Sequence, residues 1–263
     1  MSPVQAAVLG AIQGLTEFLP ISSSAHLYVV PTLLGWKYAG LAFDVALHWG
    51  TLLALLAAYG DVWIKLARDA FSAEPAPRAA AWTTLAKLAA ASVPGAVAGV
   101  ALEKLASGAL RGLPLQAAML AIFGFVLWAV DRFRPAGRDV EVPDWGTCMA
   151  MGFSQALALV PGVSRSGITI TAGRAAGLSR VSAARFSFLL ATPITFGAGL
   201  LELRHLGHGL PLSTLAIGVV SAAVVGFLAI RGLIRYLGRA GFGVFFAYRV
   251  LLAAVIAWRV LAA

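Results

Sequence analysis

The chain has 263 residues, of which 60% are hydrophobic and only 12% are charged, against about 25% charged residues in an average soluble domain. With a mean hydropathy of +0.87, it has too little polar surface to cover a water-soluble globule. The formal net charge of +9 is not gathered into a basic stripe with interleaved aromatic residues, which argues against nucleic-acid binding. Apolar runs of about 20 residues recur along the chain and predict an all-α polytopic membrane protein.

The first apolar segment, 4–30, is interrupted. It carries Glu17, then Pro20 and three serines that begin at Ser22. Proline removes a backbone donor and breaks a helix, and such a break survives at membrane depth only where protein or a watery cavity surrounds it. The segment therefore predicts a re-entrant helical hairpin that enters and leaves the membrane on one side. No cleavable signal peptide is expected, because this stretch lacks a basic n-region and carries a carboxylate.

Six full membrane spans are predicted from the remaining apolar runs, separated by polar or Pro/Gly-bearing connections such as 68–81 and 131–144. In chain order they are 41–59, 82–101, 115–130, 183–201, 213–230 and 243–262. A second interrupted segment, 145–173, lies between the third and fourth spans. Pro161, Gly162 and the sequence SRSG break it, and it predicts a second re-entrant hairpin.

The distribution of Lys and Arg supports this topology. With the loops around 60–81, 131–144, 174–182 and 231–242 inside the cell, thirteen basic residues lie on the cytoplasmic side and five on the outer side. The positive-inside rule then places both termini outside. The inner set is Lys65, Arg68, Arg78, Lys87, Arg132, Arg134, Arg138, Arg174, Arg180, Arg185, Arg231, Arg235 and Arg239, and the outer set is Lys37, Lys104, Arg111, Arg204 and Arg259. If either interrupted segment crossed the membrane fully, the alternation would fail.

The two interrupted segments resemble each other in sequence. QGLTEFLPISSSA starts at Gln13 and QALALVPGVSRSG starts at Gln155, which is an offset of 142 residues. Each half of the chain then contains one hairpin followed by three spans. Because three is odd, the second half enters the membrane upside down relative to the first.

The sequence therefore predicts a single integral membrane domain over 1–263, built from two inverted-topology repeats of about 1–134 and about 143–263. Broken helices of inverted repeats meet near the midplane of the membrane, and they place a binding site at the repeat interface.

Glu17 and Arg165 are the two ionisable residues that are hardest to explain as structure, since a charge within the membrane is costly and marks a functional site. The run PGVSRSG around Arg165 supplies two hydroxyls, a guanidinium and glycines that let backbone N–H groups approach a ligand. Arg pairs bidentately with phosphate oxygens, and a bent Gly/Ser backbone forms an anion nest. This combination predicts phosphate binding.

Each of these residues also has a purely structural interpretation. Glu17 could only pair with Arg165 as a buried ion pair, and His26 could be a satisfied polar residue at the end of a hairpin. The serines from Ser22 to Ser24 could simply cap the helix that follows.

Four further polar residues lie in the apolar surroundings. Gln13 precedes Glu17 by four residues on the same helix face and suits a supporting role. Asp44 and His48 have the same spacing, so they could line a cavity or pair with each other. Arg249 is interpreted as structural or as a snorkelling side chain.

QGLTEFLPISSSAH (13–26) and PGVSRSGITI (161–170) resemble the two signature regions of the undecaprenyl-pyrophosphate phosphatase family, bacterial membrane enzymes linked to bacitracin resistance. The resemblance continues through FDVALHWGTLLA and RFSFLLATP, and the layout of spans fits along nearly the whole chain. The family's first motif has Glu or Gln, three residues, then Glu. Gln13 and Glu17 occupy those positions here, which is the single-carboxylate form.

The resemblance implies hydrolysis of undecaprenyl pyrophosphate to undecaprenyl phosphate and inorganic phosphate, which recycles the lipid carrier for cell-wall synthesis. It places the active site on the outer, periplasmic side of the bacterial plasma (inner) membrane, and it implies a divalent cation, Mg²⁺ or Ca²⁺. Mg²⁺ typically uses one or two carboxylates together with substrate phosphates, so Glu17 is the expected metal ligand. Membrane lipids would surround the protein. The sequence is compatible with a homodimer as well as with a monomer.

The catalytic residues implied are Glu17, Ser23, His26 and Arg165. Arg165 would hold the terminal phosphoryl group and stabilise its developing charge. His26 could act as a general base on water or on Ser23, or it could itself attack as the nucleophile; assistance of Ser23 by His26 is the favoured interpretation. The expected substrate-binding residues are Gln13, Ser22, Ser24, Ser164, Ser166, Gly167 and Thr169.

The alternative function is a transporter or flippase for a phosphorylated lipid or a small anion, because inverted repeats with broken helices are a transporter architecture. Pure transport gains little from a metal-binding carboxylate beside a histidine base, so His26 near Glu17 favours the hydrolase. A structural scaffold would leave both motifs without a purpose.

Overall fold

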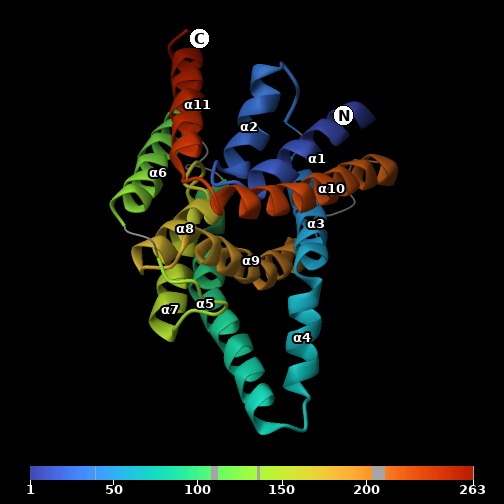
Figure 1. Cartoon of the computed structure of the whole chain (residues 1–263). Coiled ribbons are helices and arrows are strands. Elements are labelled where there is room, and N and C mark those ends of the chain that lie inside the picture. Colours follow the sequence, from blue (N-terminus) through green and yellow to red (C-terminus); the bar gives the residue numbers. More distant parts are fainter. Residues whose placement is uncertain (39, 108–111, 135–136, 203–210, 263) are drawn as a thin grey trace.

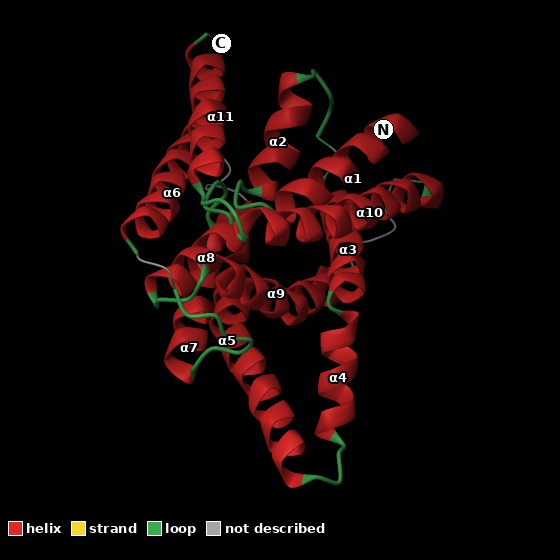
Figure 2. Ribbon diagram, in the orientation of Figure 1, coloured by secondary structure: helices red, strands yellow, loops and turns green. Residues whose placement is uncertain are grey.

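The computed structural model describes residues 1–263 apart from 39, 108–111, 135–136, 203–210 and 263, and apart from the side chains of 41–42, 103–107 and 202. The described part is helical, with no strand beyond one isolated bridge between Arg138 and Leu178 (Figure 2). In chain order the helices are α1 (Pro3–Phe18), α2 (Ser23–Leu33), α3 (Leu41–Ala58), α4 (Gly60–Ala70), α5 (Pro75–Ser107), α6 (Leu113–Phe133), α7 (Trp145–Ser154), η2 (Gln155–Leu159), α8 (Arg165–Ala175), α9 (Arg180–Glu202), α10 (Leu212–Leu237) and α11 (Gly243–Leu261).

Five described helices are long and apolar enough to cross a membrane, and a bent pair of helices raises the number to six. The five are Pro75–Leu102, Leu113–Phe133, Arg180–Leu201, Leu212–Leu237 and Gly243–Leu261, and the pair is Phe43–Ala58 with Gly60–Ala70, bent by 69°. The five helices overlap five of the predicted spans, and the first helix of the bent pair overlaps the sixth, 41–59. The chain is a multi-span, all-helical membrane protein in the part that the structure describes.

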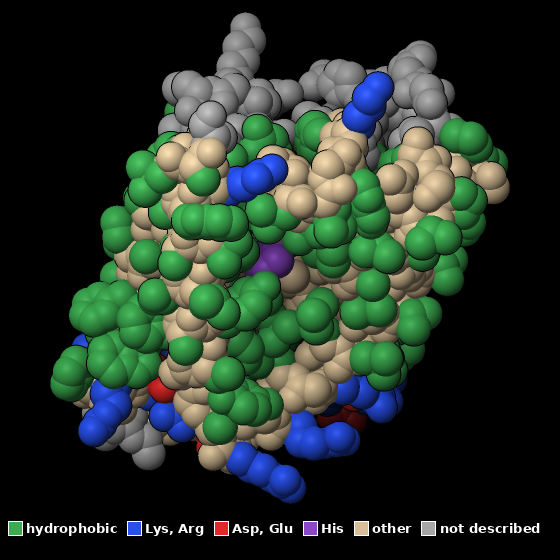
Figure 3. Space-filling view, turned by 90° about the horizontal axis from the view of Figure 1, so that it is seen from above, with side chains coloured by type: hydrophobic (Ala, Val, Ile, Leu, Met, Phe, Trp, Pro, Cys, Tyr) green, Lys and Arg blue, Asp and Glu red, His purple; other side chains and the backbone are tan. Residues whose placement is uncertain are grey.

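The surface agrees with this assignment. Figure 3 shows a broad hydrophobic band across one face, with most of the visible Lys and Arg side chains gathered along one edge of it. Lipid tails would contact the band, and the basic edge would lie among charged headgroups and water. Of the basic residues used to predict the orientation, Arg111, Arg204 and the side chain of Lys104 lie outside the described residues.

One predicted connection is wrong. Residues 60–70, assigned to a polar loop, form α4, and the span predicted at 82–101 begins already at Pro75. The polar side of α4 is stabilised by an ion pair of Lys65 with Asp69, 3.1 Å between Nζ and Oδ2. Alanines at 79–81 are strong helix formers and extend α5 beyond its apolar window. As a result α4 and α5 project from the other helices and meet at their tips (Figure 1).

Both interrupted segments break where the sequence predicts. The first helix stops at Phe18 and the next begins at Ser23, while the second segment passes from η2 through an irregular stretch to α8 at Arg165. The 16 residues of α1 span about 24 Å, and the 11 residues of α2 about 17 Å, both less than the roughly 30 Å hydrocarbon core.

The helix α1 is fixed by very close packing against α10 (Figure 1). A Cβ atom on Gly10 would lie 2.3 Å from the carbonyl oxygen of Gly218, and one on Gly14 would lie 2.5 Å from that of Ala222. Small residues allow such approach of helix backbones in membranes. Beyond this contact, Phe18 packs edge-on against Phe188 of α9 in the buried core, with ring centroids 5.5 Å apart. This packing sets the position of the last turn of α1, which carries Glu17.

Candidate active site

The two helix breaks share an unusual backbone conformation. Ser22 has φ 73° and Ser164 has φ 75°, and no other non-glycine residue in the described part of the chain has a positive φ. Each serine is the N-cap residue of the helix that follows. Each hydroxyl is hydrogen-bonded to the hydroxyl of the serine two residues further on, Ser22 to Ser24 and Ser164 to Ser166, at 3.2 Å. Such conformations cost about 1–3 kcal/mol and persist where the surroundings enforce them, often at functional sites.

Hydrogen bonds join the two break loops, although they lie far apart in the sequence. The backbone N–H of Gly162 donates to Ser22 Oγ at 3.2 Å. In the reverse direction, Ser166 Oγ donates to the carbonyl oxygen of Leu19 at 3.1 Å. The two motifs predicted to share a site are therefore adjacent.

Arg249 holds this junction from α11. Its side chain is fully buried, and its guanidinium donates to backbone carbonyls of α6 and of both break loops. The acceptors are Leu120 (2.8 Å), Met119 (3.2 Å), Pro20 (3.1 Å), Gly162 (2.8 Å) and Val163 (3.1 Å). The structural interpretation of Arg249 is confirmed, and the snorkelling alternative is wrong because the head group does not reach water.

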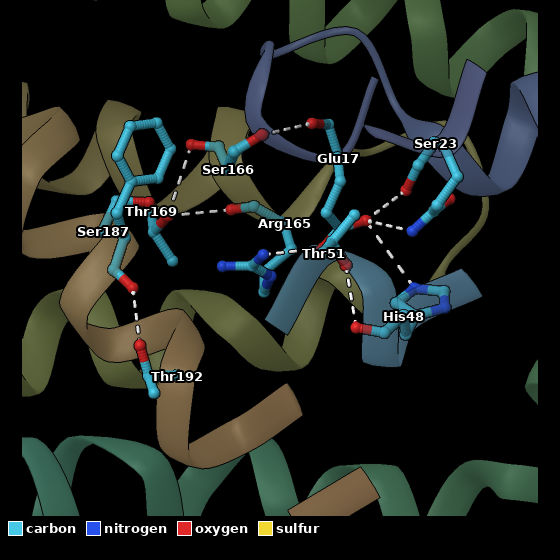
Figure 4. Close-up of polar contacts among 12 residues, drawn as sticks. Glu17, Ser23, His48, Thr51, Arg165, Ser166, Thr169, Ser187 and Thr192 are labelled. Atoms are coloured by element: carbon cyan, nitrogen blue, oxygen red, sulfur yellow. Dashed lines mark hydrogen bonds and ion pairs between the residues drawn. The ribbon is translucent and has the colours of Figure 1, made fainter. Parts of the chain in front are cut away.

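Glu17 is the centre of the site (Figure 4). Its carboxylate is 8% exposed, and Oε1 accepts a hydrogen bond from Arg165 Nη2 at 2.7 Å. Oε2 accepts from Ser23 Oγ at 2.6 Å and from Gln13 Nε2 at 3.2 Å. His48 Nε2 lies 3.6 Å from the same oxygen. A hydroxyl, a guanidinium and an imidazole thus converge on one carboxylate.

Arg165 retains a free donor. It is 16% exposed, and its Nη1 is buried with no hydrogen-bond partner in the described structure. An unpaired guanidinium nitrogen is costly to bury, so it marks a position where a ligand oxygen would be stabilised.

His26 lies away from this carboxylate. Its Nδ1 is 2.7 Å from the carbonyl oxygen of Ser22, and since a carbonyl can only accept, Nδ1 carries the proton. Its Nε2 then accepts from the hydroxyl of Tyr248 at 2.7 Å in the neutral ring, and the two rings stack with centroids 5.7 Å apart. Both ring nitrogens are therefore engaged, and neither bonds to Ser23. In this geometry the hydroxyl of Ser23 donates to Glu17 and not to His26.

The remaining predicted ligands divide into three groups. Ser24 is exposed. Ser164 Oγ accepts from the N–H of Gly167 at 3.2 Å, so both residues belong to the cap of α8. Thr169 is fully buried and bonds to Ser187 Oγ of α9 at 2.6 Å, which fixes α8 against α9.

Two residues outside the predicted set also contact site residues: His48 lies beside Glu17, and Tyr248 bonds to His26. The imidazole Nδ1 of His48 bonds to the backbone carbonyl of Asp44 at 2.7 Å, which turns Nε2 towards Glu17. The Asp44–His48 spacing was a usable signal for this residue. Tyr248 precedes the buried Arg249 in the sequence, and nothing in its own spacing marks it.

The side chains of this site supply few ligands to a metal ion when no substrate is bound. In the ranges that the structure describes, no group of three or more His, Cys, Asp or Glu side chains is placed to hold a metal. Glu17 is the single carboxylate at the junction of the two motifs, and both its oxygens already accept hydrogen bonds. This set does not form an all-protein cage, but it fits Mg²⁺, which relies on one or two carboxylates together with substrate phosphates.

Comparisons with known proteins cover nearly the whole chain. The profile of the family described as "Bacitracin resistance protein BacA" matches residues 6–255. A protein of Pelotomaculum thermopropionicum named undecaprenyl-diphosphatase is 48% identical over 250 residues, which is 95% of this chain and 94% of that protein. Proteins of the same name are 46% identical over 253 residues in Desulforudis audaxviator (96% and 95%) and 47% identical over 257 residues in Moorella thermoacetica (97% and 97%).

Proposed function

Because the chain belongs to the bacitracin resistance protein BacA family, we propose that it hydrolyses undecaprenyl pyrophosphate to undecaprenyl phosphate and inorganic phosphate. It acts in the membrane of a bacterium and recycles the lipid carrier used in cell-wall synthesis. The proposal is supported by the shared name of relatives that align end to end with this chain.

The observation that carries the mechanism is the hydrogen bond from Ser23 Oγ to Glu17 Oε2 at 2.6 Å. A hydroxyl on a carboxylate, with a guanidinium beside it, is the arrangement of a nucleophile, its base and a phosphate ligand. Ser23 Oγ attacks the terminal phosphorus while Glu17 accepts the hydroxyl proton. The bond from that phosphorus to the bridging oxygen breaks, and undecaprenyl phosphate leaves with the electron pair.

Glu17 first passes the Ser23 proton to the departing undecaprenyl phosphate and becomes a carboxylate again. A water molecule then attacks the phosphoserine while Glu17 takes a proton from it, and inorganic phosphate leaves as Glu17 returns that proton to Ser23 Oγ. Arg165 stabilises the transferring group in both steps, since its free Nη1 is available to a phosphoryl oxygen. Its ion pair with Glu17 orients the guanidinium before substrate arrives. His26, held by Ser22 and Tyr248, shapes the first break loop.

The divalent cation, Mg²⁺ or Ca²⁺, belongs to this proposal as a partner of the substrate. Bound to the pyrophosphate oxygens, it would neutralise part of their charge, and Glu17 would be its protein ligand. Gln13 supports that carboxylate through its 3.2 Å hydrogen bond.

The proposed topology has two inverted repeats, about 1–134 and 143–263, each starting with a re-entrant hairpin. It is supported by the serines Ser22 and Ser164, which share a positive φ at the offset of 142 that the sequence alignment gives. The packing partners also exchange between halves, since α1 packs on α10 and α7 packs on α5. Both termini and the mouth of the site lie on the outer side in this arrangement.

The test is phosphate release from purified protein in detergent, with undecaprenyl or farnesyl pyrophosphate and with or without a chelator. Ser23→Ala, Glu17→Gln and Arg165→Ala are each expected to lower kcat by about 100-fold or more, as loss of a general base or a transition-state charge partner does. Ser213→Ala, an exposed serine at the start of α10, is the matched control. A folded wild-type protein that binds the lipid but releases no phosphate would favour transport instead.

A further inference from the structure

A polar cavity lies where α6 ends and α11 begins. Its volume is about 420 Å³, and none of the residues that line it belongs to the break loops or contacts Glu17. Three arginines line it, Arg132, Arg134 and Arg180, and we call it the arginine cavity.

One buried carboxylate forms the base of the arginine cavity. Asp131 is 5% exposed, and its Oδ1 accepts from Arg180 Nε at 2.8 Å and from Arg174 Nε at 3.0 Å. The backbone N–H of Phe242 donates to Oδ2 at 3.4 Å. Gly241 permits this closeness, because a Cβ atom there would lie 2.7 Å from the carboxylate. Arg180 is therefore held in place before any ligand binds.

Positive charge exceeds negative charge at this cavity. Asp131 is shared between Arg174 and Arg180, while Arg132 and Arg134 are exposed and form no ion pair within the part of the chain that the structure describes. The one carboxylate thus pairs with two of these four arginines, and the two exposed ones are free to contact an anion.

Backbone N–H groups at the cavity add hydrogen-bond donors to the positive charge of the arginines. Gly243 and Val244 line the cavity and form the first turn of α11, a helix of 19 residues. The first intrahelical bond of this helix runs from the N–H of Phe246 to the carbonyl of Phe242, so the N–H groups before it have no acceptor within the helix. Guanidinium groups combined with free N–H groups at a helix start are a strong receptor for phosphate oxygens.

Apolar surroundings indicate that the phosphate belongs to a lipid. Trp128 and Tyr236 line the same cavity, and Phe133 beside it is 78% exposed. Basic pockets between membrane helices bind anionic headgroups, while neighbouring apolar side chains contact the acyl chains.

We propose that the arginine cavity is a binding site for a phosphate-bearing anion, distinct from the Glu17 site, with an anionic phospholipid headgroup as its source. No residue that lines the arginine cavity takes part in the proposed hydrolysis.

The test is retention of phosphatidylglycerol or phosphatidylcholine by the detergent-purified full chain, measured by native mass spectrometry. Wild type is expected to retain phosphatidylglycerol preferentially, and Arg132→Ala/Arg134→Ala is expected to reduce this retention about tenfold or more. Arg235→Ala/Arg239→Ala removes two exposed arginines that do not line the cavity and is the matched control. Melting temperatures of all three proteins verify that they are folded.

Competition with inorganic phosphate distinguishes the two sources. If millimolar phosphate displaces the lipid, or protects wild type but not Arg132→Ala/Arg134→Ala against thermal unfolding, the phosphate group alone is recognised. If it does neither while phosphatidylglycerol is retained, the lipid is the ligand. Equal retention of both lipids without phosphate protection, or equal loss in the two double variants, would overturn the proposal.

Discussion

Glu17 divides its two carboxylate oxygens between residues that occupy equivalent places in the chain. Ser23 is the first residue of α2 and Arg165 is the first residue of α8, and they contact Oε2 and Oε1 at 2.6 and 2.7 Å. Ser23 and Arg165 are 142 residues apart, and so are the strained serines that precede them, Ser22 and Ser164. One half of the chain thus supplies the hydroxyl, and the other half supplies the cation at the matching position.

Tyr248 is the side chain that both stacks on His26 and hydrogen-bonds to it. Tyr248→Phe keeps the stacked ring but removes the hydroxyl that His26 Nε2 accepts. We expect kcat to fall about tenfold or less, as loss of one hydrogen bond implies, with little change in melting temperature. Steady-state kinetics beside His26→Ala measure this. A loss as large as that of Ser23→Ala would mean that the tyrosine itself takes part in the chemistry.

At the scale of elements, the site depends on how the break loops are held. Arg249 satisfies carbonyls of both loops from one buried guanidinium, so α11 reaches the junction of the two motifs. A helix that contributes no side chain to the Glu17 carboxylate therefore controls the distance between the two motifs.

Arg249→Met should destabilise the protein strongly. The carbonyls of Pro20, Gly162 and Val163 lose their donor, at a cost of about 1–3 kcal/mol each, so we expect the variant to unfold at far lower temperature or not to accumulate. Arg259→Met, an exposed arginine on the same helix, is the control. Thermal unfolding in detergent decides the outcome, and equal melting temperatures for both variants would contradict this role.

Alanine substitutions at two glycines distinguish the effect of close helix packing from the effect of helix propensity. Gly14→Ala forces a Cβ atom to within 2.5 Å of a carbonyl oxygen of α10, so it should destabilise the protein and disturb Glu17 on the next turn. Gly99→Ala on α5 meets no atom within 4 Å and should stabilise it by up to about 1 kcal/mol. Thermal unfolding of the pair measures both effects. A stabilising Gly14→Ala would show that α1 does not approach α10 this closely.

At the scale of the whole molecule, hydropathy predicted all six apolar spans because a bilayer fixes the length of each run. It missed α4 and the early start of α5, where propensity and ion pairs extend helices outside the apolar window. The helix breaks followed from Pro20 with the serines after it and from Pro161 with Gly162 and the sequence SRSG. Proline alone is not a sufficient signal, because Pro31, Pro94 and Pro193 lie inside helices.

The contact of Glu17 with Arg165 could be predicted because a charge in the membrane requires a partner. The contacts of Tyr248 and Arg249 could not. They depend on helix rotation and on backbone carbonyl groups, which leave no trace in residue spacing.

The orientation of the molecule is open to a direct test, because the chain has one cysteine, Cys148, and it is buried. In a Cys148→Ser background, Ala262→Cys should react with an impermeant maleimide in right-side-out vesicles, and Arg239→Cys only in inside-out vesicles. Both positions are exposed. The reverse pattern would invert the topology and place the termini inside the cell.

The central claim is that Ser23 attacks the terminal phosphoryl group while Glu17 takes its proton. Its most direct test is rapid quenching of the protein with undecaprenyl pyrophosphate labelled in the terminal phosphate, followed by mapping of the labelled peptide. The mechanism predicts an acid-stable label on Ser23 that is absent from Ser23→Ala and present in Ser213→Ala. An acid-labile label on His26, or turnover without any protein-bound label, would contradict it.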